Sequence, residues 1–233
     1  MCTVTFLPLN ASNFLLTSNR DEHRGRETFP PKKYKENGVE LLFPKDKTAG
    51  GTWIGTSSEN RLVCVLNGAF NKHVRKPNYQ KSRGVLAKEI LKTKHLIDYI
   101  KNLELSGVEP FTMVIVDWNN QELKLYEFIW DDHQIHLNEL GLEPKIWSSS
   151  TLYSEESKNI RKTWFNTWLK NKDFRVQNVL KFHHSEIGDK TQSVLMKRPN
   201  VETVSITNVH KTDNEIQMTY EDVIHQKLIK ARF

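Results

Sequence analysis

The chain has 233 residues, of which 37% are hydrophobic and 27% charged, and its formal net charge is +6 at pH 7. This composition supports one sizeable core and excludes general disorder. No apolar run approaches the roughly 20 residues of a membrane-spanning helix, so no integral membrane segment is expected. The basic residues are scattered among 28 acidic ones without zinc-finger spacing or RNA-binding aromatic motifs, which excludes nucleic acid as an expected partner.

The two cysteines, Cys2 and Cys64, indicate a reducing compartment. Cys64 lies in an apolar run and is expected to be buried. Two cysteines make no disulfide framework, and nothing before Cys2 resembles a signal peptide. We therefore expect a cytoplasmic protein with a single domain over residues 1–233. The sequence does not define an oligomeric state.

The first third of the chain is predicted to be rich in strands. Residues 2–7 and 14–18 are predicted to be two strands of a hairpin joined by a polar turn, and further strands are predicted at 51–55 and 61–66. The polar segment 23–38, with its Pro30-Pro31 pair, is predicted to be a loop.

The remainder of the chain mixes helices and strand pairs. Because the strands come in adjacent pairs with helices between the groups, the order predicts an α+β fold rather than a βαβ repeat. The residues after 220 are a candidate terminal helix. Helices are predicted at 82–91, 96–103 and 154–170, and strands or extended segments at 111–116, 122–128, 147–150, 202–209 and 216–220.

Cys2 is the main candidate for chemistry. Removal of Met1 would leave a thiol and a free α-amine on one residue, and an α-amine with a pKa of roughly 7.7–8 can act as a general base near neutral pH. A nucleophile paired with a terminal amine is a known solution for acyl transfer. The alternative is that a small second residue is present by chance.

The segment Asn19-Arg20-Asp21-Glu22 follows the second predicted strand. Arg20 could lower the pKa of the Cys2 thiol by its charge, and Asp21 could hold the ammonium group or a water molecule. The alternative, which the residue types favour, is a solvent-exposed turn. Asn67 could donate to an oxyanion, although Asn67-Gly68 is also a common turn pair.

Three other features suggest structure more than chemistry. The run of residues 50–55 matches no phosphate-binding pattern and predicts a bulged or tightly packed strand, with Trp53 in the core or on a pocket wall. His183-His184 with Glu186 is interpreted as a surface pair, and no metal site is expected. The basic run from Lys72 to Arg83 is interpreted as a solvated loop, with an anion-binding lip as the alternative.

Met1-Cys2-Thr3, the segment 19–22, the run 50–55 and Leu66-Asn67-Gly68 occur in an order that resembles the NRDE family, also called the transport and Golgi organisation protein 2 family. This resemblance, and through it a similarity to hydrolases of the choloylglycine hydrolase and penicillin acylase type, implies an N-terminal nucleophile (Ntn) hydrolase fold, a four-layer αββα sandwich. It implies Cys2 as nucleophile, Arg20 and Asp21 as its supporting pair, and Asn67 as an oxyanion donor. It also suggests Asn19, Trp53 and Ser149 as substrate-binding residues.

Two departures from the family pattern bear on activity. Ser149 stands where a second amide is expected, and Val204 stands where the hydrolases keep a charge. The leading hypothesis is an N-terminal-cysteine amidohydrolase or acyl transferase acting on a non-peptide C–N bond of a small molecule. The alternative is a non-catalytic haem or lipid binding or trafficking protein that uses its pocket for a hydrophobic ligand. No cofactor is expected, and haem is a candidate ligand only.

Overall fold

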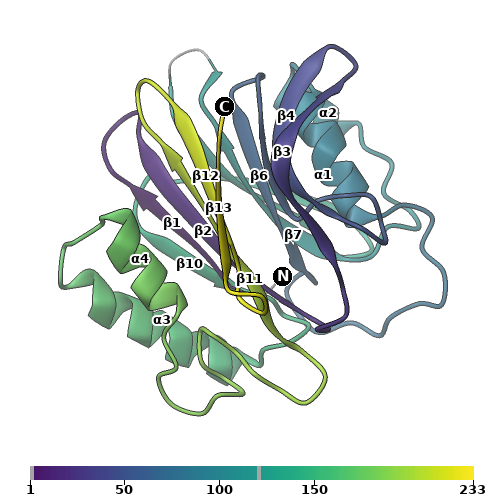
Figure 1. Cartoon of the computed structure of the whole chain (residues 1–233). Helices are drawn as coiled ribbons and strands as arrows, with labels where there is room; N and C mark the ends of the chain where they lie inside the picture. Colours follow the sequence, from purple (N-terminus) through teal and green to yellow (C-terminus); the bar gives the residue numbers. More distant parts are fainter. Residues whose placement is uncertain (1–2, 120–121) are drawn as a thin grey trace. The chain divides into compact units, whose positions relative to one another are not determined.

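The computed structural model describes residues 3–119 and 122–233 (Figure 1). Within these residues the chain forms two compact units. The first unit joins two distant parts of the chain, residues 3–26 and 143–232, and the second consists of residues 27–142 with Phe233. Each unit contains one antiparallel sheet and two of the described α-helices.

The first unit is built on a six-stranded sheet in the order β10-β1-β2-β11-β12-β13. β1 and β2 form the predicted hairpin, and its turn is closed by Asn10, whose Oδ1 accepts hydrogen bonds from the backbone N–H groups of Ser12 and Asn13. The elements of this unit are β1 (Thr3–Pro8), β2 (Phe14–Glu22), β10 (Lys145–Ser148), α3 (Glu155–Leu169), α4 (Val176–His183), β11 (Glu202–Lys211), β12 (Ile216–Asp222) and β13 (Lys227–Arg232).

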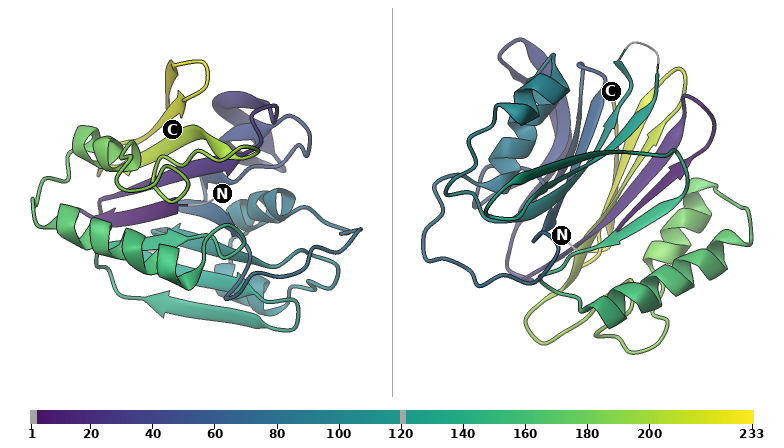
Figure 2. Two further views of the ribbon diagram at one scale, coloured as in Figure 1. Left: turned by 90° about the horizontal axis from the view of Figure 1, so that it is seen from below. Right: turned by 180° about the vertical axis from the view of Figure 1, so that it is seen from behind.

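Both helices of the first unit cover one face of its sheet (Figure 2). Phe165 of α3 and Phe182 of α4 pack with Leu7 and Leu15, which are paired across β1 and β2. α3 begins after Ser154, whose hydroxyl accepts a hydrogen bond from the N–H of Ser157, the usual N-cap arrangement. Side chains alternate between the faces of a strand, so the odd-numbered positions from Thr3 to Leu7 face the helices.

The second unit is a seven-stranded meander in chain order, from β3 to β9, with α1 and α2 packed on one face. Leu86 and Ile90 of α1 belong to the same apolar cluster as Val63, Met113 and Phe128 of the sheet. The elements are β3 (Thr28–Glu36), β4 (Val39–Asp46), β5 (Ile54–Ser57), β6 (Arg61–Asn67), α1 (Arg83–Lys92), α2 (Leu96–Lys101), β7 (Phe111–Asp117), β8 (Lys124–Trp130) and β9 (Ile135–Leu140).

The glycine-rich run before β5 is tightly packed, as predicted. A Cβ atom on Gly51 would lie 2.6 Å from the carbonyl carbon of Gly84, and one on Gly84 would lie 2.7 Å from the carbonyl oxygen of Thr52. The backbone N–H of Thr52 donates to the carbonyl of Gly84 at 3.2 Å. The two glycines therefore let the start of α1 approach this segment, and Trp53 lies in the core with 5% of its surface exposed.

Arg61 anchors the other end of α1. Its buried guanidinium pairs with Asp117 at 2.7 Å and donates to the carbonyls of Ile90, in the last turn of α1, and Thr93, its C-cap residue. A cation bonded to C-terminal carbonyls satisfies groups that the helix leaves unpaired and suits the negative end of its dipole.

Two secondary-structure predictions were wrong. The segment 23–38 contains β3, which tolerates Pro30 and Pro31 because it is an edge strand whose pairing with β4 shifts register between Phe29 and Lys32. The candidate terminal helix is instead β13, the edge strand of the first sheet. Strands β4 and β9 and helix α4 were not predicted. None of the helices in the described part of the chain has the length and apolar character to cross a bilayer.

Candidate functional site

Cys2 lies outside the described residues. Its chain neighbour Thr3 is the first residue of β1, where it is paired with Ser148 of β10 on one side and Asn19 of β2 on the other. Thr3 is wholly buried. Asn19, the first residue of the segment 19–22, is therefore the direct neighbour of the start of β1 in the sheet.

Residues 19–22 complete β2 rather than forming an exposed turn. Asn19, Arg20 and Asp21 are all buried, with at most 3% of their surfaces exposed, because β11 pairs with β2 along this stretch. Asn19 and Asp21 face the helices, whereas alternation places Arg20 on the opposite face. The expectation of an exposed turn was wrong, and the side chains of Arg20 and Asp21 lie on opposite faces of the sheet.

Asp21 is held by two hydroxyl groups. Tyr153 Oη donates to its Oδ2 at 2.8 Å, and Thr203 Oγ1 donates to its Oδ1 at 2.6 Å. The Thr203 oxygen in turn accepts a hydrogen bond from the backbone N–H of Met196 at 3.0 Å. These contacts fix the carboxylate between β11 and the segment that leads into α3.

Arg20 carries a buried charge on the other face of β2. Its Nη1 donates to the carbonyl of Arg26 at 3.2 Å, and its Nη2 lies 4.0 Å from Glu22 Oε2. A guanidinium that is fixed and shielded from water stabilises an anion placed near it more strongly than an exposed one does.

Asn19 and His183 form a second buried contact, on the face of the sheet that the helices cover. The Asn19 amide nitrogen donates to the carbonyls of His183 and Val194, so its oxygen is the acceptor for His183 Nδ1 at 2.6 Å. Nδ1 therefore carries the proton, and Nε2 accepts from the hydroxyl of Thr5 at 2.7 Å. Every polar atom of the neutral imidazole is thus satisfied.

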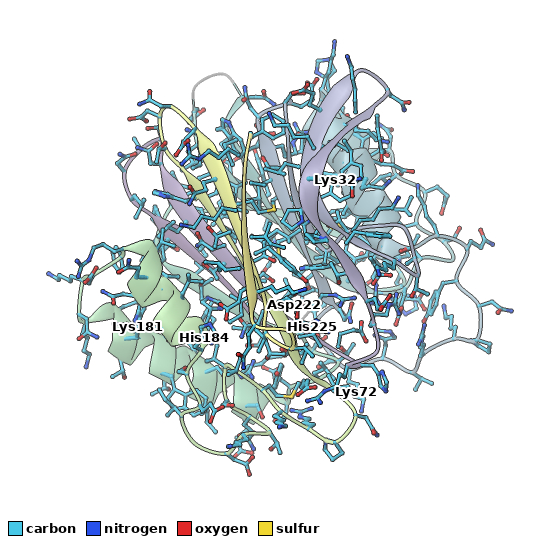
Figure 3. The ribbon with its side chains drawn as sticks, viewed as in Figure 1. Lys32, Lys72, Lys181, His184, Asp222 and His225 are labelled. Carbon is cyan, nitrogen blue, oxygen red and sulfur yellow. The ribbon has the colours of Figure 1, made fainter. Side chains whose placement is uncertain are left out.

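His183 is a buried, neutral histidine, so the interpretation of a surface pair was wrong for it. Burial lowers its pKa to about 3, and the positive charges of His184 and Arg161 act in the same direction. His184, labelled in Figure 3, is half-exposed, and its hydrogen bond to Glu221 raises its pKa. Among the described residues, no group of three or more His, Cys, Asp or Glu side chains could hold a metal ion.

Arg161 of α3 contacts Thr3 and Tyr153, and the sequence analysis did not identify it. Its Nη1 donates to Thr3 Oγ1 at 2.5 Å, its Nε to the carbonyl of Gln192 at 2.9 Å, and its Nη2 to the carbonyl of Ser193. Its guanidinium lies 3.5 Å from the ring centroid of Tyr153. The available signal was a charged residue four positions before Phe165, on the buried stripe of an amphipathic helix.

The other predicted site residues are distributed over both units. Ser149 follows β10 in the first unit, is 1% exposed, and accepts at its carbonyl from the N–H of Tyr153 at 3.1 Å. Asn67 ends β6 in the second unit and is half-buried, next to Gly68, whose φ of +82° suits the turn. Trp53 also belongs to the second unit.

The basic run after Asn67 is a surface segment, in agreement with its interpretation as a solvated loop. Lys72, labelled in Figure 3, and Arg75 are exposed. Lys76 forms an ion pair with Asp132, and Lys81 forms one with Glu89.

The structure has the fold of the Ntn hydrolases. It is similar to a variant of conjugated bile acid hydrolase from Clostridium perfringens (TM-score 0.60, 10% identity, 99% of this chain and 92% of that one). It is similar to penicillin V acylase from Agrobacterium tumefaciens (TM-score 0.59, 10% identity, 99% of this chain and 85% of that one). It is also similar to the Caenorhabditis elegans N-acylethanolamine-hydrolyzing acid amidase orthologue (TM-score 0.58, 13% identity, 89% of this chain and 92% of that one). The predicted fold class is confirmed, and each unit has the sheet and covering helices that half of an αββα sandwich requires.

The sequence places the chain more narrowly. The profile of the Transport and Golgi organisation 2 family matches residues 1–228, so the chain belongs to this family. No curated protein sequence matches it.

Proposed function

We propose that this chain is an N-terminal-cysteine enzyme that cleaves a non-peptide amide bond of a small molecule or transfers its acyl group. The fold supports the proposal, because its structural neighbours are named as a bile acid hydrolase, a penicillin V acylase and an N-acylethanolamine-hydrolyzing acid amidase. The observation that carries it is the anchoring of Thr3, which pairs with Asn19 and accepts a hydrogen bond from buried Arg161. The proposed nucleophile, Cys2, is covalently attached to this fixed strand end.

The proposed reaction begins with loss of Met1. The free α-amine of Cys2 takes the thiol proton, and the thiolate attacks the carbonyl carbon of the amide. The tetrahedral intermediate collapses as the C–N bond breaks, and the ammonium returns the proton to the departing amine. Water then attacks the thioester with the α-amine as base, releasing the acid and restoring the thiol; in a transfer reaction, another acceptor replaces water.

Two further residues have proposed roles in this reaction. Arg20 supplies a buried positive charge that favours the thiolate. Asp21 is assigned a positioning role, because both of its carboxylate oxygens are engaged by Tyr153 and Thr203.

The experiment combines N-terminal mass spectrometry, thiol labelling and a panel of N-acyl amides. The expected result is a chain without Met1 whose Cys2 reacts with iodoacetamide near pH 7 much faster than buried Cys64. Cys2→Ala should abolish amide cleavage, whereas the matched control Cys64→Ser should keep it. Retention of Met1, or full activity of Cys2→Ala, would exclude the mechanism and leave the ligand-binding hypothesis.

A further inference from the structure

A pocket of about 580 Å³ lies in the first unit, at the end of β2 and the start of β11. Its lining comes from the turn after β2 and from the segment 190–202. This segment contains Met196 and ends directly before Thr203, and both belong with Tyr153 and Asp21 to the hydrogen-bonded group that we call the Asp21 cluster. The charged side chains in its lining are Arg24, Lys190, Lys197, Arg198 and Glu202.

The pocket has a surplus of positive charge. Four of these five side chains are cationic, and the carboxylate of Glu202 is already occupied by the guanidinium of Arg24, through Nε and through Nη2 at 3.1 Å. This hydrogen bond lowers the pKa of Glu202. The remaining ion pair, Lys190 with Glu186, is 3.7 Å long and exposed, and pairs of this kind contribute little.

Arg198 is oriented by two hydrogen bonds to backbone carbonyls. Its Nε donates to the carbonyl of Thr191 at 2.9 Å and its Nη1 to the carbonyl of Leu152 at 3.0 Å. Both acceptors are neutral, and in the described part of the chain neither Arg198 nor Lys197 forms an ion pair with a carboxylate. A guanidinium whose orientation is fixed in this way is prepared to bind an oxyanion at low entropic cost.

The pocket adjoins the Asp21 cluster. The guanidinium of Arg198 lies 5.1 Å from the ring centroid of Tyr153, the residue that donates to Asp21. Glu202 directly precedes Thr203, the second donor to Asp21. A ligand group bound between Lys197 and Arg198 would therefore be close to Tyr153. Tyr153 in turn contacts Arg161, which donates to Thr3.

We propose that this pocket binds an anionic oxygen group, either a phosphate or a carboxylate, carried by the substrate. Its role as a substrate subsite rests on the proposed amidase function, whereas binding of the anion itself does not. The inference assigns the substrate to the class of acyl amides that bear a negative charge remote from the scissile bond.

Binding is tested by isothermal titration of the full chain with pyrophosphate and with citrate, at constant ionic strength. We expect saturable binding of one of the two anions, and the stronger binder identifies the source of the charge. Lys197→Gln and Arg198→Gln should each weaken binding about tenfold, the usual effect of losing one charge-assisted hydrogen bond. The matched control is Lys181→Gln, an exposed lysine on α4 (Figure 3), which should leave binding unchanged.

Activity provides the second test. The KM for an anionic N-acyl amide should rise in Lys197→Gln, while the KM for a neutral analogue and kcat for both should be unchanged. The Cys2→Ala variant should retain anion binding, which separates failure of the pocket from failure of the proposed chemistry. Lys197→Gln also covers the case in which Arg198→Gln does not fold. Absence of saturable binding to the wild-type chain, or equal binding by wild type and Lys197→Gln, would overturn the proposal.

Discussion

Replacement of Arg161 tests whether a buried cation is held by its hydrogen bonds alone. Arg161 is fully buried, and its three hydrogen bonds go to neutral acceptors on Thr3, Gln192 and Ser193. Charge-assisted hydrogen bonds contribute about 1.5–3 kcal/mol each. Replacing the cation by a neutral side chain removes the free-energy cost of burying an ion, which is several kcal/mol, and this gain offsets part of the lost hydrogen-bond energy.

The net loss of unfolding free energy expected for Arg161→Met is therefore about 2–4 kcal/mol. Arg161→Lys should be at least as destabilising, because a single ammonium keeps the buried charge but cannot reach all three acceptors as the planar guanidinium does. Burial would lower the pKa of the new lysine, so the unfolded chain would bind more protons than the folded one. The stability of Arg161→Lys should accordingly rise between pH 7 and pH 9, and that of Arg161→Met should not.

Urea unfolding at several pH values measures these differences, and Lys181→Gln serves as a surface control. A stability of Arg161→Lys equal to that of the wild-type chain would refute the reasoning. So would a gain in stability on replacement by Met, because the hydrogen bonds would then not outweigh the cost of the buried charge.

Three other predictions concern stability and are checked by equilibrium unfolding. Because the folded pKa of His183 is about 3 and the unfolded one roughly 6.5, its contribution is present above pH 6.5 and falls by about 1.4 kcal/mol per unit as the pH drops toward 3; His183→Gln should lose this slope. Gly84→Ala should cost about 1–3 kcal/mol through its clash with Thr52, whereas Gly25→Ala, with no atom closer than 3.4 Å, should be nearly neutral. Arg61→Met should cost about 3–5 kcal/mol by leaving the Asp117 carboxylate without its partner, and a smaller loss from Asp117→Asn would agree with this.

Elements with strong local signals were predictable. The helix expected at 154–170 is Glu155–Leu169 in the structure, because Ser154 supplies the N-cap and the apolar spacing continues to the end. The strands expected at 202–209 and 216–220 are present within β11 and β12. In each case, alternation or helical periodicity within the segment was sufficient.

Elements whose environment overrides their composition were not predictable. Pro30 and Pro31 argue against a strand because proline has no N–H group to donate. β3 lies at a sheet edge, however, where the missing N–H groups leave no neighbouring strand without a donor. The end of the chain contains β13, which is largely exposed and packs few apolar side chains. Its pairing with β12 depends on the sheet rather than on its own sequence pattern.

The candidate site was predictable as a location but not as an arrangement. The position of residues 19–22 at the end of the second strand was correct. Their burial was not foreseen, because it results from pairing with β11, which is about 180 residues away. The same holds for Arg161 and His183, whose polar side chains gave no local indication that their partners were Thr3 and Asn19.

The composition of the first unit has a consequence for how the protein forms during synthesis. Residues 19–21 are made early, but their partners Tyr153, His183 and Thr203 are translated more than 130 residues later. The second unit, whose strands pair in chain order, has its whole meander available before those partners exist. Since domains fold as their segments leave the ribosome, the buried network around Asp21 is among the last parts of the protein to assemble. A partly synthesised chain would therefore carry residues 19–22 without the contacts that hold them in place.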